Sequence, residues 1–328
     1  MPLPCKVSAD EHLSFETSGI AKNCHKALSM TAAADPKKLT KPEPIDVLPY
    51  AFIAPAIIVA LAIAILPLIY SLWLSLQDWY LLNGPDPSWG GLTNYHAMLS
   101  DTALWSAFVR TWIWTIGTVL VEIAIALPLA LLLNRDTPVA RAASALILLP
   151  WVTPFIVIGF GWRFLLDSEA GPLHNMLHAV GVAGDSSVLS DPNLALIVVI
   201  FVSGWKGVPF MALALLAALK SVPADLYEAA EVDGAGPFAR FWTITLPMIQ
   251  NTMLIIGIVL GILAFYSFDL PWIMTRGGPQ DATTLVGITM YKAVFQELRP
   301  AYAAAISVVM LVFLALASVT ALKLRRRM

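Results

Sequence analysis

Residues 220–247 read KSVPADLYEAAEVDGAGPFARFWTITLP and separate two long apolar runs of the chain. Pro223 suits the first turn of a helix, and Asp225 complements the positive end of the helix dipole. The helix is expected to run to about Asp233 and to stop at Gly234, because glycine readily adopts a positive φ.

The second half of this stretch contains further turn signals. Gly236-Pro237 predicts a turn, Pro237 can open a second short helix, and Pro247 is expected to start the next apolar run. Ala229 and Ala230 leave a small flat patch that another protein can approach closely. The stretch therefore predicts a helix-turn-helix lying on a membrane surface.

The rest of the chain indicates that this surface is a lipid bilayer. Hydrophobic residues make up 58% of the 328 residues and charged residues only 13%, whereas a soluble domain carries about 25% charged residues. A hydrocarbon core about 30 Å thick requires about 20 apolar residues per helix. Six runs meet that length, at roughly 50–77, 106–134, 143–166, 193–219, 247–269 and 301–322. The sequence predicts an all-α integral membrane protein with six transmembrane helices.

Four prolines lie inside these runs: Pro67, Pro128, Pro154 and Pro209. Each is expected to kink its helix without ending it, because neighbouring helices or waters can satisfy the carbonyls that proline frees.

Lysine and arginine set the orientation, since cytoplasmic loops carry an excess of them. With six spans, both termini and two loops share one side, which holds fourteen of these residues, whereas the opposite side holds three. Both termini are therefore predicted to be cytoplasmic. An aromatic belt at the outer interface agrees with this orientation and comprises Trp73, Trp79, Tyr80, Trp105 and Trp112.

Residues 1–46 are polar and predict a disordered cytoplasmic tail, whereas residues 47–328 form the predicted transmembrane domain. The tail has no apolar h-region of a secretory signal, and Met30 offers a shorter start, so residues 1–29 receive no function. Its two cysteines, Cys5 and Cys24, make neither a disulfide framework nor a metal site. The net charge of −2 gives no basic field for nucleic acid.

The loop between the fourth and fifth runs resembles a known signature. Glu228-Ala229-Ala230, three residues, Gly234, nine residues, Ile244, one residue and Leu246-Pro247 match the EAA motif of ABC importer permeases. In that family the loop is a coupling helix seated in a groove of the ATP-binding subunit. The resemblance implies the type I importer fold and docking residues with Glu228 and Gly234 at the centre: Leu226, Tyr227, Glu228, Ala229, Ala230, Asp233 and Gly234.

Further segments resemble the sugar-permease branch, similar to the larger maltose subunit and its glycerol-phosphate relatives. They are Gly91-Leu-Thr-Asn-Tyr95, Trp205-Lys-Gly-Val-Pro-Phe210, Phe268-Asp269 and Thr275-Arg-Gly-Gly-Pro279. The chain lacks the extra N-terminal spans and the large extracellular insert of the maltose subunit. The solute expected from the resemblance is a disaccharide or another oligosaccharide or glycoside, and glycerol-3-phosphate or another polar solute is the alternative.

The resemblance also implies the partners: a second, homologous permease, two ATP-binding subunits and an extracytoplasmic solute-binding protein in a bacterial inner membrane. The sequence has no G-x-x-x-x-G-K-[ST] phosphate loop. ATP and magnesium are therefore expected on the separate ATPase, with no cofactor and no catalytic residue in this chain.

Charged and polar residues inside the spans are candidates for the solute path. Glu122 and Lys206 lie near the middle of the second and fourth runs, where an ionisable group requires an interior or a cavity. They can line the path or pair with each other, and Lys206 can also extend to the interface. Tyr266 and Ser267, with Ser203, Gly207 and Phe210, supply the hydroxyl and aromatic mixture that sugars require, and the resemblance points to the last three.

Two other classes of protein fit the sequence less well. A secondary transporter would show internal repeats and broken helices without a long docking loop. A membrane enzyme would show clustered titratable residues or metal-ligand spacing. The chain has five histidines, none inside a predicted span; His174 and His178 are four apart without a third ligand and are interpreted as surface residues.

Overall fold

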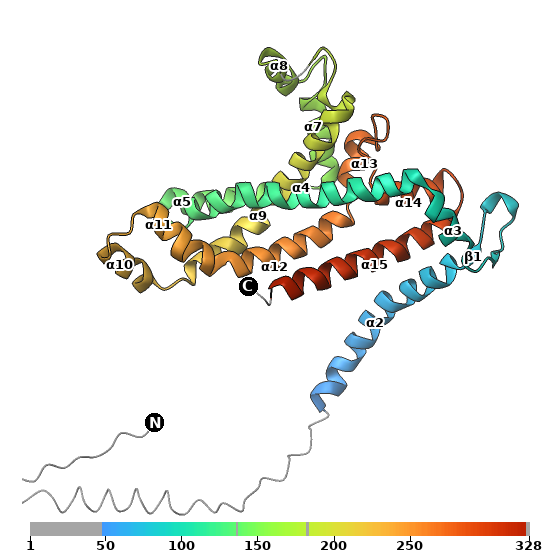
Figure 1. Ribbon diagram of the computed structural model, residues 1–328, viewed down its shortest axis with the longest axis horizontal. Coiled ribbons are helices and arrows are strands. Elements are labelled where there is room, and N and C mark those ends of the chain that lie inside the picture. The colour runs from blue at the N-terminus through green and yellow to red at the C-terminus, as the bar shows by residue number, and fades with distance from the viewer. Residues whose placement is uncertain (1–47, 136, 182–183, 326–328) are drawn as a thin grey trace, which may run out of the picture. The chain divides into compact units, whose positions relative to one another are not determined.

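The computed structural model describes residues 48–135, 137–181 and 184–325, which are mostly helical (Figure 1). The predicted tail, with Cys5 and Cys24, lies outside these residues. Within them, five helices are long and apolar enough to cross a membrane. These are α2 (Leu48–Ser75), α4 (Thr102–Leu133), α9 (Pro192–Lys220), α12 (Leu246–Phe265) and α15 (Pro300–Arg325).

The third apolar run is broken rather than kinked. It forms α5 (Pro138–Leu146), α6 (Leu149–Val152) and α7 (Phe155–Leu165), and the chain bends by 92° between Val152 and Phe155. Pro154 explains the break, because the residue before a proline is driven out of the helical region, and Thr153 is extended at ψ 130°. The expectation that Pro154 kinks a continuous helix is therefore wrong. The bent pair supplies the sixth span if it counts as one.

The fifth apolar helix begins earlier than expected. The short helix α11 (Pro237–Arg240) continues through the π-helical turn η3 (Phe241–Thr245) into α12 without a gap. The helix therefore runs unbroken from Pro237 to Phe265; within it α12 begins at Leu246, next to the predicted start at 247, and ends four residues before the predicted 269. Pro247 lies in the first turn of α12, where its missing N–H is tolerated.

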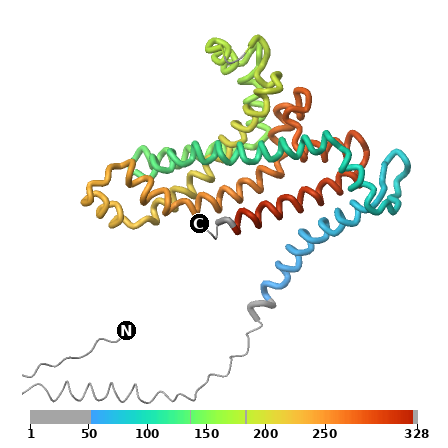
Figure 2. Tube along the Cα trace, in the orientation of Figure 1, coloured from blue at the N-terminus to red at the C-terminus, as the bar shows by residue number. Residues whose placement is uncertain are grey.

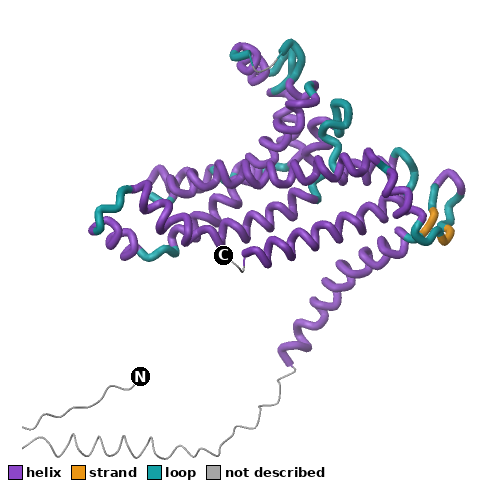
Figure 3. The backbone as a smooth tube through the Cα atoms, in the orientation of Figure 1, coloured by secondary structure: helices purple, strands orange, loops and turns teal. Residues whose placement is uncertain are grey.

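Shorter elements connect the long helices (Figure 3). Beyond the long helices, the described part of the chain holds β1 (Gln77–Asp78) paired antiparallel with β2 (Ser88–Trp89), η1 (Leu81–Asn83), α3 (Thr93–Ser100), α8 (Pro172–Ala179), η2 (Val188–Ser190), α10 (Ala224–Val232), α13 (Asp269–Thr275) and α14 (Val286–Phe295).

The structure divides into two units inside α2, between Ala62 and Ile63. In the unit that starts at Ile63, α4, α9, α12 and α15 lie side by side (Figure 2). Glycine permits the close approach of α9 to α4, because a Cβ at Gly204 would overlap Val121. The apolar core between α4, α9 and α12 contains completely buried side chains from all three helices: Ala126, Ala130, Met211, Leu215 and Ile249.

The segment Gly91–Tyr95 fastens the end of α2. The buried Asn94 amide donates to the carbonyl oxygens of Ser75 at 3.0 Å and Gln77 at 2.7 Å. The Tyr95 hydroxyl lies 2.8 Å from the hydroxyl of Ser75. These contacts satisfy carbonyls that the helix end leaves free.

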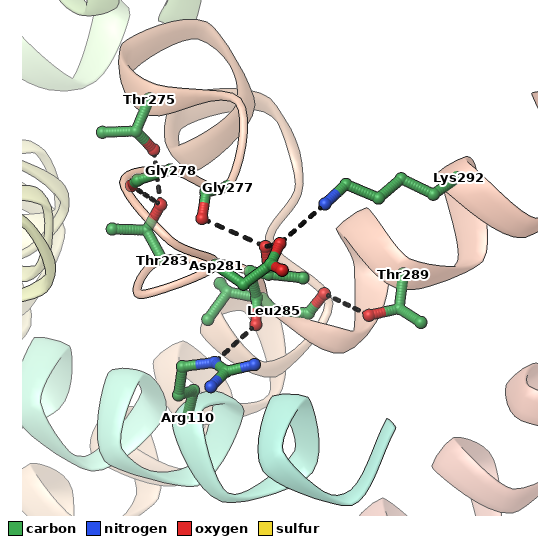
Figure 4. A network of polar contacts seen from close by, with 10 residues as sticks. Arg110, Thr275, Gly277, Gly278, Asp281, Thr283, Leu285, Thr289 and Lys292 are labelled. Carbon is green, nitrogen blue, oxygen red and sulfur yellow. Dashed lines mark hydrogen bonds and ion pairs between the residues drawn. The ribbon is translucent and has the colours of Figure 1, made fainter. Parts of the chain in front are cut away.

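The loop between α13 and α14 is held by a polar network (Figure 4). The Asp281 carboxylate accepts from Lys292 Nζ at 2.9 Å and from the Thr284 hydroxyl at 2.8 Å, and these contacts lower the pKa of Asp281. Arg110 of α4 donates to the Thr284 carbonyl at 3.0 Å. The Thr275 and Thr283 hydroxyls lie 2.6 Å apart. The loop is thus tied both to α14 and to α4.

Asp101 joins the start of α4 to α15 and offers a test of this packing. Its Oδ1 accepts from the Leu104 N–H at 2.9 Å, and its Oδ2 accepts from the Tyr302 hydroxyl at 2.6 Å. Asp101→Ala should lower the free energy of unfolding by about 1–3 kcal/mol, because it removes a helix cap and a charge-assisted hydrogen bond. Thermal denaturation in detergent measures the change.

Two variants separate the contributions of Asp101. Asp101→Asn should keep most of the cap and lose less stability, whereas Tyr302→Phe should remove only the link to α15. Wild-type stability in Asp101→Ala would contradict the prediction.

Candidate functional site

The helix-turn-helix loop folds as its sequence predicts at the first helix. Pro223 precedes α10, and Gly234 follows it with φ +78°. The Ala235 N–H donates to the Ala230 carbonyl at 2.8 Å, and the Gly234 N–H donates to the Glu231 carbonyl at 3.0 Å. This pattern of two bonds closes the helix end and requires a positive φ at Gly234.

The predicted docking residues differ in exposure. Leu226, Glu228, Ala229, Asp233 and Gly234 are exposed, whereas Tyr227 and Ala230 are half-buried. The Tyr227 hydroxyl lies 3.0 Å from the buried Thr245 hydroxyl in η3. Tyr227 therefore also fixes α10 against the start of the fifth helix.

Sequence reasoning missed three exposed apolar residues of the loop. Val232 is 88% exposed, Phe238 78% and Trp242 53%. The Phe238 and Trp242 rings pack edge to face with centroids 6.1 Å apart. Their spacing of four residues places both on one helix face, which is a signal that the sequence contained.

An ion pair braces the two helices of the loop. Arg240 Nη1 in α11 lies 3.0 Å from Glu231 Oε2 in α10. The pair is partly exposed, so its contribution to stability is small.

A cavity of about 240 Å³ lies where α4, α9 and α12 meet the broken span. Five of the seven predicted path residues line it, and they come from three helix regions far apart in the sequence. The lining comprises Thr118, Glu122, Trp151, Phe155, Ser203, Lys206, Gly207, Leu260, Leu263, Ala264 and Ser267.

The other two predicted path residues, Phe210 and Tyr266, do not line this cavity. Phe210 is exposed and stacks on Trp151, with ring centroids 6.3 Å apart. Tyr266 is 48% exposed and packs edge to face against Phe265. Trp151 and Phe155 were missed because they flank the unforeseen break at Pro154.

Lys206 caps the broken span. Its Nζ donates to the carbonyl oxygens of Pro150 at 3.2 Å, Trp151 at 2.9 Å and Thr153 at 2.9 Å. The ammonium group also lies 4.6 Å from the centre of the Phe155 ring. Because the break leaves these carbonyls without helical partners, the three ammonium hydrogens replace the missing N–H donors.

Glu122 lines the same cavity and forms no ion pair with Lys206. The ion pairs among the described residues are His178–Asp185, Arg240–Glu231 and Lys292–Asp281. Glu122 is 4% exposed, and its Oε2 has no hydrogen-bond partner. A Cβ at Gly207 would overlap its carboxyl group, so the glycine makes room for Glu122. The interpretation of a Glu122–Lys206 pair is therefore wrong, as is extension of Lys206 to the interface.

The histidines of the loop after α7 also differ from expectation. His174 is buried at 3% exposure in α8, whereas His178 is exposed and lies 3.5 Å from Asp185. The surface interpretation of His174 was wrong. In the described ranges, no cluster of three histidine, cysteine or acidic side chains could hold a metal ion.

The cap and the unpaired carboxyl group predict different mutant behaviour. Lys206→Met should reduce folded yield and melting temperature, because each buried carbonyl left without a donor costs about 1–3 kcal/mol. Glu122→Gln should fold normally, and the double variant should resemble Lys206→Met. Fluorescence-detected size-exclusion chromatography and thermal denaturation measure both quantities.

Lys220→Met, at the exposed end of α9, is the matched control for loss of a lysine. Partial recovery of yield in the double variant would indicate that Glu122 and Lys206 interact after all.

Solved structures support the fold. The chain matches a bacterial alginate ABC transporter in complex with an alginate pentasaccharide-bound periplasmic protein, with a TM-score of 0.73 and 22% identity over 86% of this chain and 95% of that one. A methionine ABC transporter in an inward-facing conformation matches with a TM-score of 0.51 and 17% identity, over 68% of this chain and 95% of that one. The type I importer architecture expected from the sequence is therefore confirmed.

Sequence comparisons extend from the fold to the family. The chain is 33% identical over 243 residues to the trehalose/maltose transport system permease protein MalF of Thermococcus litoralis, covering 74% of this chain and 81% of that protein. It is 33% identical over 261 residues to the trehalose transport system permease protein SugA of Mycobacterium tuberculosis, covering 80% and 83%. Residues 122–328 match the family model of the binding-protein-dependent transport system inner membrane component. The chain belongs to this family and is a multi-pass permease subunit of an ABC importer.

Proposed function

We propose that this permease forms half of the path for a sugar and couples its passage to ATP hydrolysis by a separate subunit. The observation that carries the proposal is the cavity, whose lining combines the hydroxyl-bearing Ser203 and Ser267 with the aromatic Trp151 and Phe155. Sugars present both hydroxyls and C–H faces, so such a mixture suits them. The names of the trehalose and maltose relatives support a disaccharide or another oligosaccharide or glycoside.

The two helices that flank the loop support the coupling. The loop leaves the end of α9 at Lys220 and returns through the helix that starts at Pro237. Both helices also line the cavity, α9 at Ser203 to Gly207 and α12 at Leu260 to Ala264. A displacement of the loop by an ATPase would therefore be carried to the cavity along two continuous helices.

Three local contacts restrain the loop between α9 and the fifth helix. The Glu231–Arg240 ion pair, the contact of Tyr227 with Thr245 and the closed helix end at Gly234 fix α10 relative to the fifth helix. Four exposed apolar side chains near the EAA residues offer a contact surface to a partner: Leu226, Val232, Phe238 and Trp242.

The complete importer would contain a second permease, two ATP-binding subunits that hold ATP and magnesium, and an extracytoplasmic solute-binding protein. The alginate transporter was solved with a periplasmic protein, which agrees with the last of these. Both termini would face the cytoplasm, because fourteen lysines and arginines lie on that side against three.

The coupling assignment is tested by Glu228→Lys and Gly234→Asp. Both variants should insert into the membrane, lose the ATPase during affinity purification and abolish uptake of radiolabelled trehalose and maltose. Gly234→Asp should act because a side chain at φ +78° is strained and would widen the contact. Glu169→Lys, in an exposed loop of the opposite side, is the matched control. Normal ATPase association and normal uptake in both variants would remove the coupling assignment.

The orientation is tested by cysteine labelling in a background with Cys5→Ser and Cys24→Ser. In intact cells, an impermeant maleimide should label Val180→Cys from outside, whereas Val232→Cys should be labelled only in inside-out vesicles. Both side chains are exposed in the permease alone, at 71% and 88%, so the permease is expressed without its ATPase to keep Val232→Cys accessible. Labelling with the opposite sidedness would overturn the orientation.

A further inference from the structure

Two buried polar groups of α4 face the cavity without a partner. Glu122 is 4% exposed and Thr118 2% exposed, and neither Glu122 Oε2 nor Thr118 Oγ1 has a hydrogen-bond partner. The two residues are four apart and lie on one face of the helix. Buried polar groups are nearly always hydrogen-bonded, and leaving one unpaired costs free energy. Both residues line the cavity, so a rotation of each side chain would bring its oxygen to a molecule held there.

The positively charged residue of the cavity lining, Lys206, already donates its ammonium hydrogens to the backbone. Lys206 is the one basic side chain among the described residues that line the cavity. Its ammonium group has three hydrogens and donates to three backbone carbonyls, at 2.9, 2.9 and 3.2 Å. A phosphate, sulfonate or carboxylate in the cavity would therefore meet the Glu122 carboxyl group and find no free basic donor in this half of the path.

Moving Lys206 to meet an anion would damage the fold. The carbonyl oxygens of Pro150, Trp151 and Thr153 would lose their donors at the 92° break. An anionic solute would thus have to compete with the cap that holds the broken span. The rest of the lining is neutral and combines hydroxyl groups with aromatic and aliphatic side chains.

We propose that Glu122 and Thr118 form a hydrogen-bonding subsite for the hydroxyl groups of an uncharged polyhydroxy solute, and that this half of the path disfavours anionic solutes. The proposal rests on the proposed function and narrows its solute class. It predicts that glycerol-3-phosphate and other acidic solutes are carried less well than neutral ones. Gly207 belongs to the subsite, because only a residue without a side chain leaves the Glu122 carboxyl group its place.

The charge preference can be measured without knowing the solute. The complete transporter is purified with its partner subunits in a Cys5→Ser, Cys24→Ser background that carries Ser203→Cys. Its reaction with neutral methyl methanethiosulfonate is compared with that of the anionic 2-sulfonatoethyl reagent. Val180→Cys, on the exposed loop, provides the reference ratio of the two rates.

The ratio of neutral to anionic rate should be at least about tenfold higher at position 203 than at position 180, because the cavity offers an anion no free cation. A ratio of neutral to anionic rate that is the same at positions 203 and 180 would overturn the charge preference. The variant Thr320→Cys, on an exposed face of α15, is the control that shows whether detergent alone changes the ratio of neutral to anionic rate.

The hydrogen-bonding subsite is tested by uptake into proteoliposomes of trehalose, maltose and glycerol-3-phosphate. For a neutral sugar that is carried, Glu122→Leu should raise KM by about 10- to 100-fold, since it removes hydrogen bonds to a charged or strongly polar acceptor. Glu122→Gln keeps one acceptor oxygen and should raise KM less. Thr320→Val, whose hydroxyl bonds only to its own helix, should leave KM unchanged.

The outcomes separate the two proposals. An unchanged KM in Glu122→Leu, or uptake of glycerol-3-phosphate in preference to both sugars, would overturn the subsite while leaving the coupling assignment intact. If none of the three probes is carried, trehalose and maltose are excluded as solutes while other glycosides remain within the proposed function, and the labelling ratio decides whether the cavity excludes anions.

Discussion

Three hydrogen bonds from the Lys206 ammonium group to backbone carbonyl oxygens brace the broken span where it lines the cavity. Pro154 ends the helical ladder of the third span, and the carbonyls of Pro150, Trp151 and Thr153 would otherwise face a medium without donors. Non-helical backbone at membrane depth is tolerated only where protein or a water-filled space satisfies it. Lys206 supplies that partner from α9, and the break brings the Trp151 ring to the cavity wall.

The same helix that supplies the cap, α9, also leads to the loop at residues 220–247. From Lys206 to Lys220, α9 is continuous, and its packing on α4 is close because Gly204 and Gly207 carry no side chain. The returning helix is continuous from Pro237 to Phe265. In the proposed coupling, movement of the loop would reach the cavity through these two continuous helices, which contain Pro209 in α9 and the π-helical turn η3 before α12.

The sequence predicted the features that depend on neighbouring residues, such as the helix end at Gly234. The break at Pro154 was missed because a proline in an apolar run gives a kink or a break according to what satisfies its neighbours. Here the decisive donor, Lys206, lies more than fifty residues along the chain. The predicted pairing of Lys206 with Glu122 was wrong for the same reason, because Lys206 donates all three ammonium hydrogens to backbone carbonyls. Three cavity residues could be predicted because each is polar or small within an apolar run: Ser203, Gly207 and Ser267. The family resemblance also pointed to the first two.

Once Lys206 is committed to the backbone, the position of Glu122 needs a separate explanation. An interior glycine costs a helix about 1 kcal/mol relative to alanine. An unpaired carboxyl group near the middle of a span costs several times as much. Gly207 in α9 carries the first cost and Glu122 in α4 the second, and the two residues are in contact. Alanine at 207 and leucine at 122 would carry neither cost. A structural purpose would be served better by those apolar residues. What the costly arrangement adds is a hydrogen-bonding group at the cavity wall, and its value is realised only when a polar molecule occupies the cavity.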